Sequence, residues 1–275
     1  MNRRILRTIV VKDLKEVRQN RAAWIPAIII PLVFVILIPL LIILVPSLFG
    51  LSMTSLVSDS GPVGMMRAKI PELASRLAGL DELQTWVVLM TGYLFAPFML
   101  AMPLMLSTIV GAESFVGEKE RKTIEALIYT PATDGELFVG KMLASVAPAV
   151  AVAWLSFLVY GVVVNAAAWP VMGRIWFPPV TWWPLMVWVT PAIATLGMAV
   201  TVLISARVNT FMEAYQMSAS LVVLVLALVA GQVTGVLYLS VGMALAVGAL
   251  LWVVDAVLIW LGIGNLRRET LLSRI

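Results

Sequence analysis

Eight residues, GELFVGKM from Gly135 to Met142, contain the spacing G-x-x-x-x-G-K that phosphate-binding loops use. In such a loop the lysine contacts the phosphates and a following Ser or Thr holds magnesium. A buried strand before the loop makes backbone N–H groups converge on the phosphates. Here Met142 follows Lys141, and the residues from Pro131 to Asp134 do not form a strand pattern. The stretch is therefore predicted not to bind ATP, and Lys141 is interpreted as the start of the apolar segment that follows.

The composition of the chain excludes several common kinds of catalysis and metal binding. Cysteine and histidine are both absent from the 275 residues. This excludes a disulfide framework, the usual zinc sites, and Ser-His-Asp or Cys-His catalysis. We assign no catalytic residue and no metal ligand.

The richest charged stretch runs from Gly111 to Met142 and holds six acids and four bases. Its first part, Glu118 to Tyr129, is predicted to be a short helix that ends before Thr130 and Pro131. Thr133 or Asp134 could cap a second helix. The first helix would have a polar side and an apolar side that could fit a groove on a partner domain. The polar side holds Glu118, Glu120, Arg121 and Glu125, and the apolar side holds Ile124, Leu127 and Ile128. The alternative is a solvated loop of mixed charge.

The whole chain has the composition of an integral membrane protein, with 61% apolar and only 12% charged residues. We predict a single all-α domain over residues 1–275. A span needs about 20 mostly apolar residues. Six such segments can be drawn: 24–45, 86–111, 142–166, 182–205, 218–237 and 239–266.

The boundary between the last two segments is open. The intervening GQVTGVLYLSVG has no charged loop, so the fifth segment could break and turn back near the outer surface. Gly231 and Gly235 also form G-x-x-x-G, which could instead serve close helix packing.

Orientation follows from the positions of Lys and Arg, since cytoplasmic flanks are enriched in them. Fifteen of the 19 fall on the side of the two termini and of the loop 113–141. Both termini are therefore predicted to be cytoplasmic. The net charge of +4 lies beside apolar segments, so lipid headgroups of the bilayer are the expected partner and nucleic acid is not.

The N-terminal residues 1–22 are predicted to form an amphipathic helix in the headgroup plane, and not a cleavable signal peptide. Its apolar face would hold Leu6, Ile9, Val10, Leu14 and Val17, with Arg7, Lys15 and Arg18 facing away. Asp13 and Glu16 interrupt the apolar edge. The alternative is an ordinary basic flank that fixes topology.

On the outer side, Pro71 is expected to open a short helix whose Leu73, Leu77 and Leu80 share a face. Five tryptophans lie near the outer ends of the third and fourth spans, where indole rings favour the membrane interface. They are Trp169, Trp176, Trp182, Trp183 and Trp188. An anchoring belt is expected.

Asp255 is the one ionisable residue deep in a predicted span. Such a residue is costly in the membrane, which makes it a functional candidate that lines a pathway or meets a partner helix. It could instead pair structurally with Asn165, Gln232 or a backbone group.

The pattern E-x-E-x-x-T-I-E-x-L-x-x-T-P from Glu118 to Pro131, followed by Gly140 and Lys141, resembles the signature of type-2 ABC-transporter permeases. The order of elements is similar along the whole chain, including a short segment from Ser205 to Gln216 between the fourth and fifth spans. Ile124 stands where Leu is more usual. The outer loop is shorter than in the sodium-exporter-like members.

The resemblance implies a permease of an ATP-driven exporter in the cell inner (plasma) membrane, not an enzyme itself. ATP and Mg would be bound by a separate nucleotide-binding (ATPase) subunit, and a second permease copy or a related chain would complete the complex. The loop 113–141 would dock on the ATPase as a coupling helix, with a membrane-entry turn at Pro131, Gly140 and Lys141. The coupling residues would be Glu118, Glu120, Arg121, Thr123, Ile124, Glu125, Leu127 and Ile128.

Two other classes compete with this interpretation. An ion-gradient-driven secondary carrier or channel usually places several ionisable groups in the membrane, and this chain offers one. A membrane-embedded enzyme would need a catalytic constellation, which the sequence lacks. The transported substrate stays open, since lipids, hydrophobic peptides, drugs and ions are all compatible with apolar walls.

Overall fold

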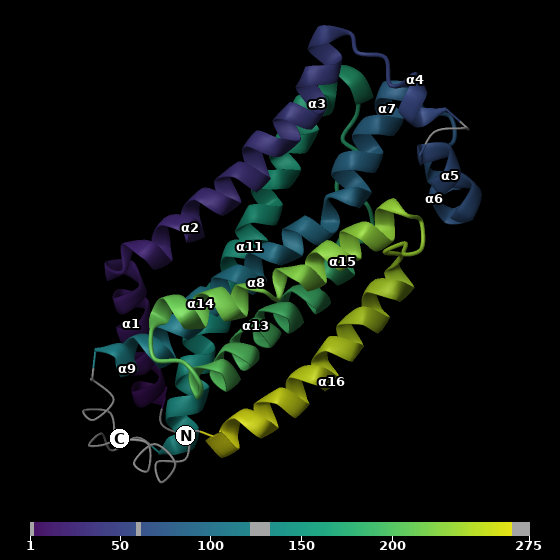
Figure 1. The fold of residues 1–275 in the computed structure, drawn as a ribbon. Helices are drawn as coiled ribbons and strands as arrows, with labels where there is room; N and C mark the ends of the chain where they lie inside the picture. Colours follow the sequence, from purple (N-terminus) through teal and green to yellow (C-terminus); the bar gives the residue numbers. More distant parts are fainter. Residues whose placement is uncertain (1–2, 59–61, 122–132, 266–275) are drawn as a thin grey trace.

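The computed structural model describes residues 3–58, 62–121 and 133–265, and every regular element among them is helical (Figure 1). The first half contains α1 (Arg3–Gln19), α2 (Arg21–Leu32), η1 (Val33–Leu37), α3 (Ile38–Phe49), α4 (Thr54–Val57), α5 (Pro62–Lys69), α6 (Pro71–Leu77), α7 (Glu82–Val87), η2 (Val88–Leu94), α8 (Ala96–Ala112), η3 (Glu113–Gly117) and α9 (Glu118–Glu120). The second half contains α11 (Asp134–Met172), α12 (Trp182–Pro184), η4 (Leu185–Val189), α13 (Thr190–Ser205), α14 (Phe211–Ala219), α15 (Val222–Val233) and α16 (Val241–Asn265). The η elements are π-helical turns within longer helices.

Six helices are long and apolar enough to cross a membrane, which confirms the predicted number. They cover Ile28–Phe49, Glu82–Glu120, Gly135–Met172, Trp182–Ser205, Phe211–Val233 and Val241–Gly262. The second and third contain 39 and 38 residues, far more than the roughly 20 that hydrocarbon requires. Both extend into the predicted loop 113–141, so much of that loop is helix.

The two ends of the bundle differ in what they carry (Figure 1). At one end, called here the α1 end, α1 and α9 lie together, and α16 finishes there. At the opposite end, the α6 end, the short helices α4, α5 and α6 lie beside α7. As predicted, Pro71 begins α6, with Leu73 and Leu77 buried and Leu80 partly buried.

The chain turns back at the α6 end between α15 and α16. Of the two alternatives, a bend and G-x-x-x-G helix packing, the bend is therefore the one observed. Gly235 has a left-handed φ of 69°, and the N–H groups of Val236 and Leu237 both donate to the carbonyl of Gly231. A Cβ at Gly231 would lie 2.4 Å from Leu237, a residue of the turn. The two glycines therefore belong to the bend between α15 and α16, and because α15 ends at Val233, before Gly235, they do not form a G-x-x-x-G face of one helix.

The centre of the bundle is the contact between α8 and α13. Gly197 of α13 permits it, because a Cβ there would lie 2.5 Å from Ser107 Oγ and 2.9 Å from the carbonyl oxygen of Leu104. One turn closer to the α1 end along the same contact, a Cβ at Gly111 would lie 3.4 Å from the Thr201 side chain. Small residues of this kind let membrane helices approach closely.

Gly197→Ala is expected to destabilise the protein by about 1 to 3 kcal/mol, because the backbone of α8 cannot yield to the added methyl group. Equilibrium unfolding in mixed detergent and dodecyl sulfate measures this. Gly135→Ala is the matched control, since nothing lies within 4 Å of a Cβ there. An unchanged midpoint for Gly197→Ala would mean that α8 and α13 are less closely packed than described.

The expected tryptophan belt is partly wrong. Trp169 and Trp183 are more than half exposed, as anchors would be, but Trp182 has no exposed surface. Its indole N–H donates to the carbonyl of Gly92 at 2.7 Å, within η2. In π-helical bonding that carbonyl would pair with residue 97, and Pro97 has no N–H. Trp182 therefore supplies a missing hydrogen bond in the core.

Candidate functional site

A cluster of charged residues lies at the α1 end, where the second and third long helices extend beyond the predicted spans. The second helix continues through η3 into α9, which α1 flanks (Figure 1). The third begins at a capping box in which Thr133 Oγ1 accepts from Glu136 N at 3.2 Å and Glu136 Oε2 accepts from Thr133 N at 3.2 Å. Of the two predicted caps, Thr133 is the one used.

Glu118 is the centre of the cluster. It is buried, and its two carboxylate oxygens contact different lysines: Oε2 accepts from Lys141 Nζ of α11 at 2.8 Å, and Oε1 accepts from Lys12 Nζ of α1. Lys141 is also buried, donates to the carbonyl and hydroxyl of Ser114, and lies 5.0 Å from the ring centre of Phe115. Three helices are thus joined through one carboxylate.

The helix α1 contributes its own buried acid. Asp13 is 1% exposed and accepts a hydrogen bond from Ser114 Oγ. One turn earlier, Ile9 packs so closely on Gly140 that a Cβ at Gly140 would meet the Ile9 side chain at 3.0 Å. The face of α1 that meets the bundle therefore runs through Ile9, Asp13 and Val17, while Leu14, predicted to share that face, is exposed.

A second buried carboxylate, Glu113 of η3, is held by two residues. Arg121 Nη1 donates to its Oε1 at 2.6 Å, and Asn20 Nδ2 donates to its Oε2 at 2.7 Å. Arg121 Nη2 also reaches Glu16 of α1 at 3.3 Å. Glu113 is 1% exposed, so its charge depends on these partners.

The remaining two residues of α9 contact the segment before α14. Lys119 Nζ donates to the carbonyl of Val208 at 2.9 Å. Glu120 Oε2 accepts from the backbone N–H of Phe211 at 2.8 Å, at the first residue of α14. Every residue from Glu118 to Arg121 is thus bonded to another part of the chain.

The carboxylates of the cluster also shift the pKa of the lysine on α1. Burial lowers the pKa of Lys12, but the hydrogen bond to Glu118 and the nearby charges of Asp13 and Glu16 outweigh it, so the pKa lies above the usual 10.5. The oxygens of Asp13, Glu16 and Glu118 lie close enough together to hold a metal ion. The ammonium of Lys12 lies 3.7 Å from Asp13, 3.3 Å from Glu16 and in contact with Glu118. The Lys12 ammonium thus supplies the positive charge between these three carboxylates, where a metal ion would otherwise bind.

Two sequence expectations about these residues are wrong. Glu118 does not lie on an outward polar face, because two lysines hold it inside. Gly140 and Lys141 do not form a membrane-entry turn, because the cap at Thr133 has already started α11. The stretch Gly135 to Met142 lies wholly within this helix, so it lacks the loop geometry that a phosphate site needs. Outside the described residues lie Thr123, Ile124, Glu125, Leu127, Ile128 and Pro131.

Sequence reasoning missed the partners of α9. Lys12 bonds to Glu118 of α9, Glu113 bonds to Arg121 at the end of α9, and Asp13 and Ser114 join α1 to η3; none was singled out for that role. The available signal was Asp13 itself, an acid on an otherwise apolar helix face, which required a buried partner.

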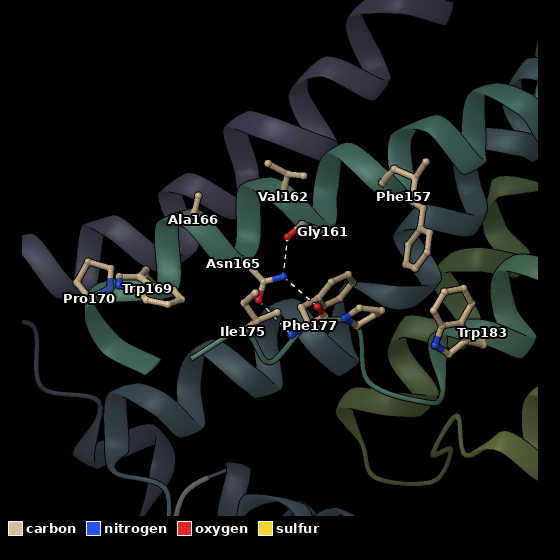
Figure 2. Close-up of a pocket in the computed structure, with 12 residues that line it drawn as sticks. Phe157, Gly161, Val162, Asn165, Ala166, Trp169, Pro170, Ile175, Phe177 and Trp183 are labelled. Atoms are coloured by element: carbon tan, nitrogen blue, oxygen red, sulfur yellow. Dashed lines mark hydrogen bonds between the residues drawn. The ribbon is translucent and has the colours of Figure 1, made fainter. Parts of the chain in front are cut away.

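A separate groove of about 710 Å³ lies between the C-terminal half of α11 and the loop before α12 (Figure 2). The amide of Asn165, which lines it, is fully bonded: the nitrogen donates to the carbonyls of Gly161 and Phe177, and the oxygen accepts from the N–H groups of Trp176 and Phe177. Asn165 therefore holds the loop before α12 against α11, and its own amide has no group left for a ligand.

Comparison with known proteins places the chain in a family. A family model described as ABC-2 family transporter protein matches residues 7–266. No curated protein and no solved structure matches the chain. With nearly the whole chain matched and six helices able to span a membrane, the protein belongs to the ABC-2 transporter family and is a multi-pass membrane permease.

Proposed function

We propose that this permease is the membrane-spanning subunit of an ATP-driven exporter, and that the segment 118–131 couples it to a separate ATPase subunit. ATP and Mg are bound by that subunit and not by this chain. The α1 end faces the cytoplasm, α1 lies at the headgroup level of the cell inner membrane, and a second permease copy or a related chain completes the complex. The basic residues concentrated at this end support the orientation.

The observation that carries the proposal is the position of α9. It stands at the start of the signature segment. Together with Arg121, which follows it, α9 is bonded to α1 and η3, and also to the beginnings of α11 and α14. A force applied to residues 122–131 by a partner therefore reaches the ends of the second, third and fifth long helices at once. Buried charge pairs transmit such a displacement well, since separating them is costly.

The competing function is a secondary carrier or channel driven by an ion gradient. That class needs intramembrane ionisable groups for coupling, and Asp255 is the only charged residue in the six apolar segments predicted from the sequence. The elaborate charge cluster at the α1 end has no role in that mechanism. We therefore favour ATP-driven transport.

Copurification tests the proposal. The tagged permease, extracted in mild detergent from its native membrane, should retain an ATPase subunit, and the complex should hydrolyse ATP in the presence of magnesium. The permease purified alone should show neither hydrolysis nor saturable nucleotide binding. Recovery of a permease without any ATPase, or ATP binding by the permease that is lost in Lys141→Ala, would contradict the proposal.

A further inference from the structure

Asp255 of α16 is 1% exposed, and neither of its carboxylate oxygens has a hydrogen-bond partner among the described residues. The structural partners considered from the sequence do not meet it. Asn165 is fully bonded to the loop before α12, and Gln232 has a buried side-chain oxygen that also lacks a partner. The carboxyl group is therefore unexplained by packing within the described chain.

Among the described residues, the helices that pack most on α16 offer Asp255 no countercharge. The elements packed against α16 are α13, η4 and α12, and none of them contains a titratable side chain. On α16 itself, residues 241–265 include no other charged residue. An acid in such a place is stable as an ion only when a positive charge joins it.

The contact of α16 with η4 and α13, called here the α13–α16 seam, also holds an unpaired donor. The indole Nε1 of Trp252 is buried and has no partner. Trp252 precedes Asp255 by three residues, so the two side chains share a face of the helix. The Trp252 ring lies 5.9 Å from that of Trp188. A carboxyl group beside aromatic rings is the arrangement that binds organic cations.

The two helices of the seam run parallel, and two close contacts between them identify the residue of α13 that lies beside Asp255. A Cβ at Gly248 would meet Trp188, and one at Gly262 would meet Val202. The same offset places Asp255 level with Thr195 of α13, which is 4% exposed. α16 lies at the edge of the bundle (Figure 1) and packs chiefly on α13, so it can separate from α13 without disturbing α8.

We propose that the α13–α16 seam opens to water and binds a cationic group, an ammonium or guanidinium carried by the transported substrate. Asp255 supplies the carboxylate and Trp252 the aromatic ring, while the indole N–H bonds to water that enters with the cation. This inference names the substrate class of the proposed transporter and so rests on the proposed function. The closed seam leaves three polar atoms unpaired, and opening it satisfies them.

The absence of cysteine from the chain makes the test direct. Thr195→Cys is reconstituted into liposomes without any ATPase, and its reaction with a cationic methanethiosulfonate is compared with that of an anionic one. We expect the cationic reagent to react about ten times faster or more, because an acid-lined cleft concentrates cations. Asp255→Asn in the same background should reduce the ratio to that of Ile175→Cys, at a residue 74% exposed in the loop before α12.

Trp252→Cys, tested with the same two reagents, provides a second position if Thr195→Cys does not fold. No reaction with either reagent, equal reaction with both, or a preference that survives Asp255→Asn would each overturn the inference. Because no ATPase is present, these outcomes do not depend on whether an ATPase copurifies.

Discussion

Lys141→Met is expected to lower the free energy of unfolding by about 3 kcal/mol, because it leaves Glu118 buried with one of its two cations missing. Breaking a buried ion pair from one side costs about 3 to 5 kcal/mol. We expect the lower value because Lys12 still contacts Glu118. Methionine keeps most of the volume of lysine, so the change isolates the charge and the bonds to Ser114.

Equilibrium unfolding in mixed detergent and dodecyl sulfate measures the effect, with Lys15→Met as the matched control. Lys15 lies on the exposed side of α1, and its replacement should change the stability by less than about 0.5 kcal/mol. The double variant Lys141→Met, Glu118→Met should recover stability relative to the single variant, because it removes both buried charges. Equal stabilities for Lys141→Met and the wild type would show that the cluster does not hold α11 to α9.

Much of the fold could be predicted from the sequence because membrane spans depend on composition over long windows. The six long helices, the helix that begins at Pro71 and the cap at Thr133 all follow from local patterns. Helix lengths beyond the membrane could not be predicted in this way. The extension of the second helix to Glu120 uses polar residues such as Glu113, and only tertiary partners such as Arg121 and Asn20 make their burial possible.

The candidate site shows the same limit. The sequence drew attention to Glu118, Arg121 and Lys141, but not to the contacts that Glu118 and Arg121 make with α1, about a hundred residues earlier in the chain: Glu118 and Lys12 are 106 positions apart. Trp182 is a similar case, since its burial depends on a carbonyl that Pro97 leaves unbonded in another helix. Such long-range contacts leave no periodic signal in one sequence.

Ile124→Asp is expected to release the ATPase subunit from the permease. Ile124 lies outside the described residues, and the expectation rests on its place in the apolar side of the signature segment that follows α9. An unpaired charge buried at a contact costs about 2 to 5 kcal/mol, which corresponds to a loss of roughly 30-fold to 4,000-fold in affinity. A partner held at micromolar strength would then dissociate during purification.

The most direct test of the coupling proposal is the amount of ATPase subunit retained by tagged permease variants after purification in the same detergent. Ile175→Asp is the matched control, since it makes the same substitution at a residue 74% exposed in the loop before α12. We predict that Ile175→Asp retains the ATPase as the wild type does, while Ile124→Asp is inserted in the membrane normally and loses it. Full retention of the ATPase by Ile124→Asp would show that the segment following α9 does not dock on it, and would contradict the account.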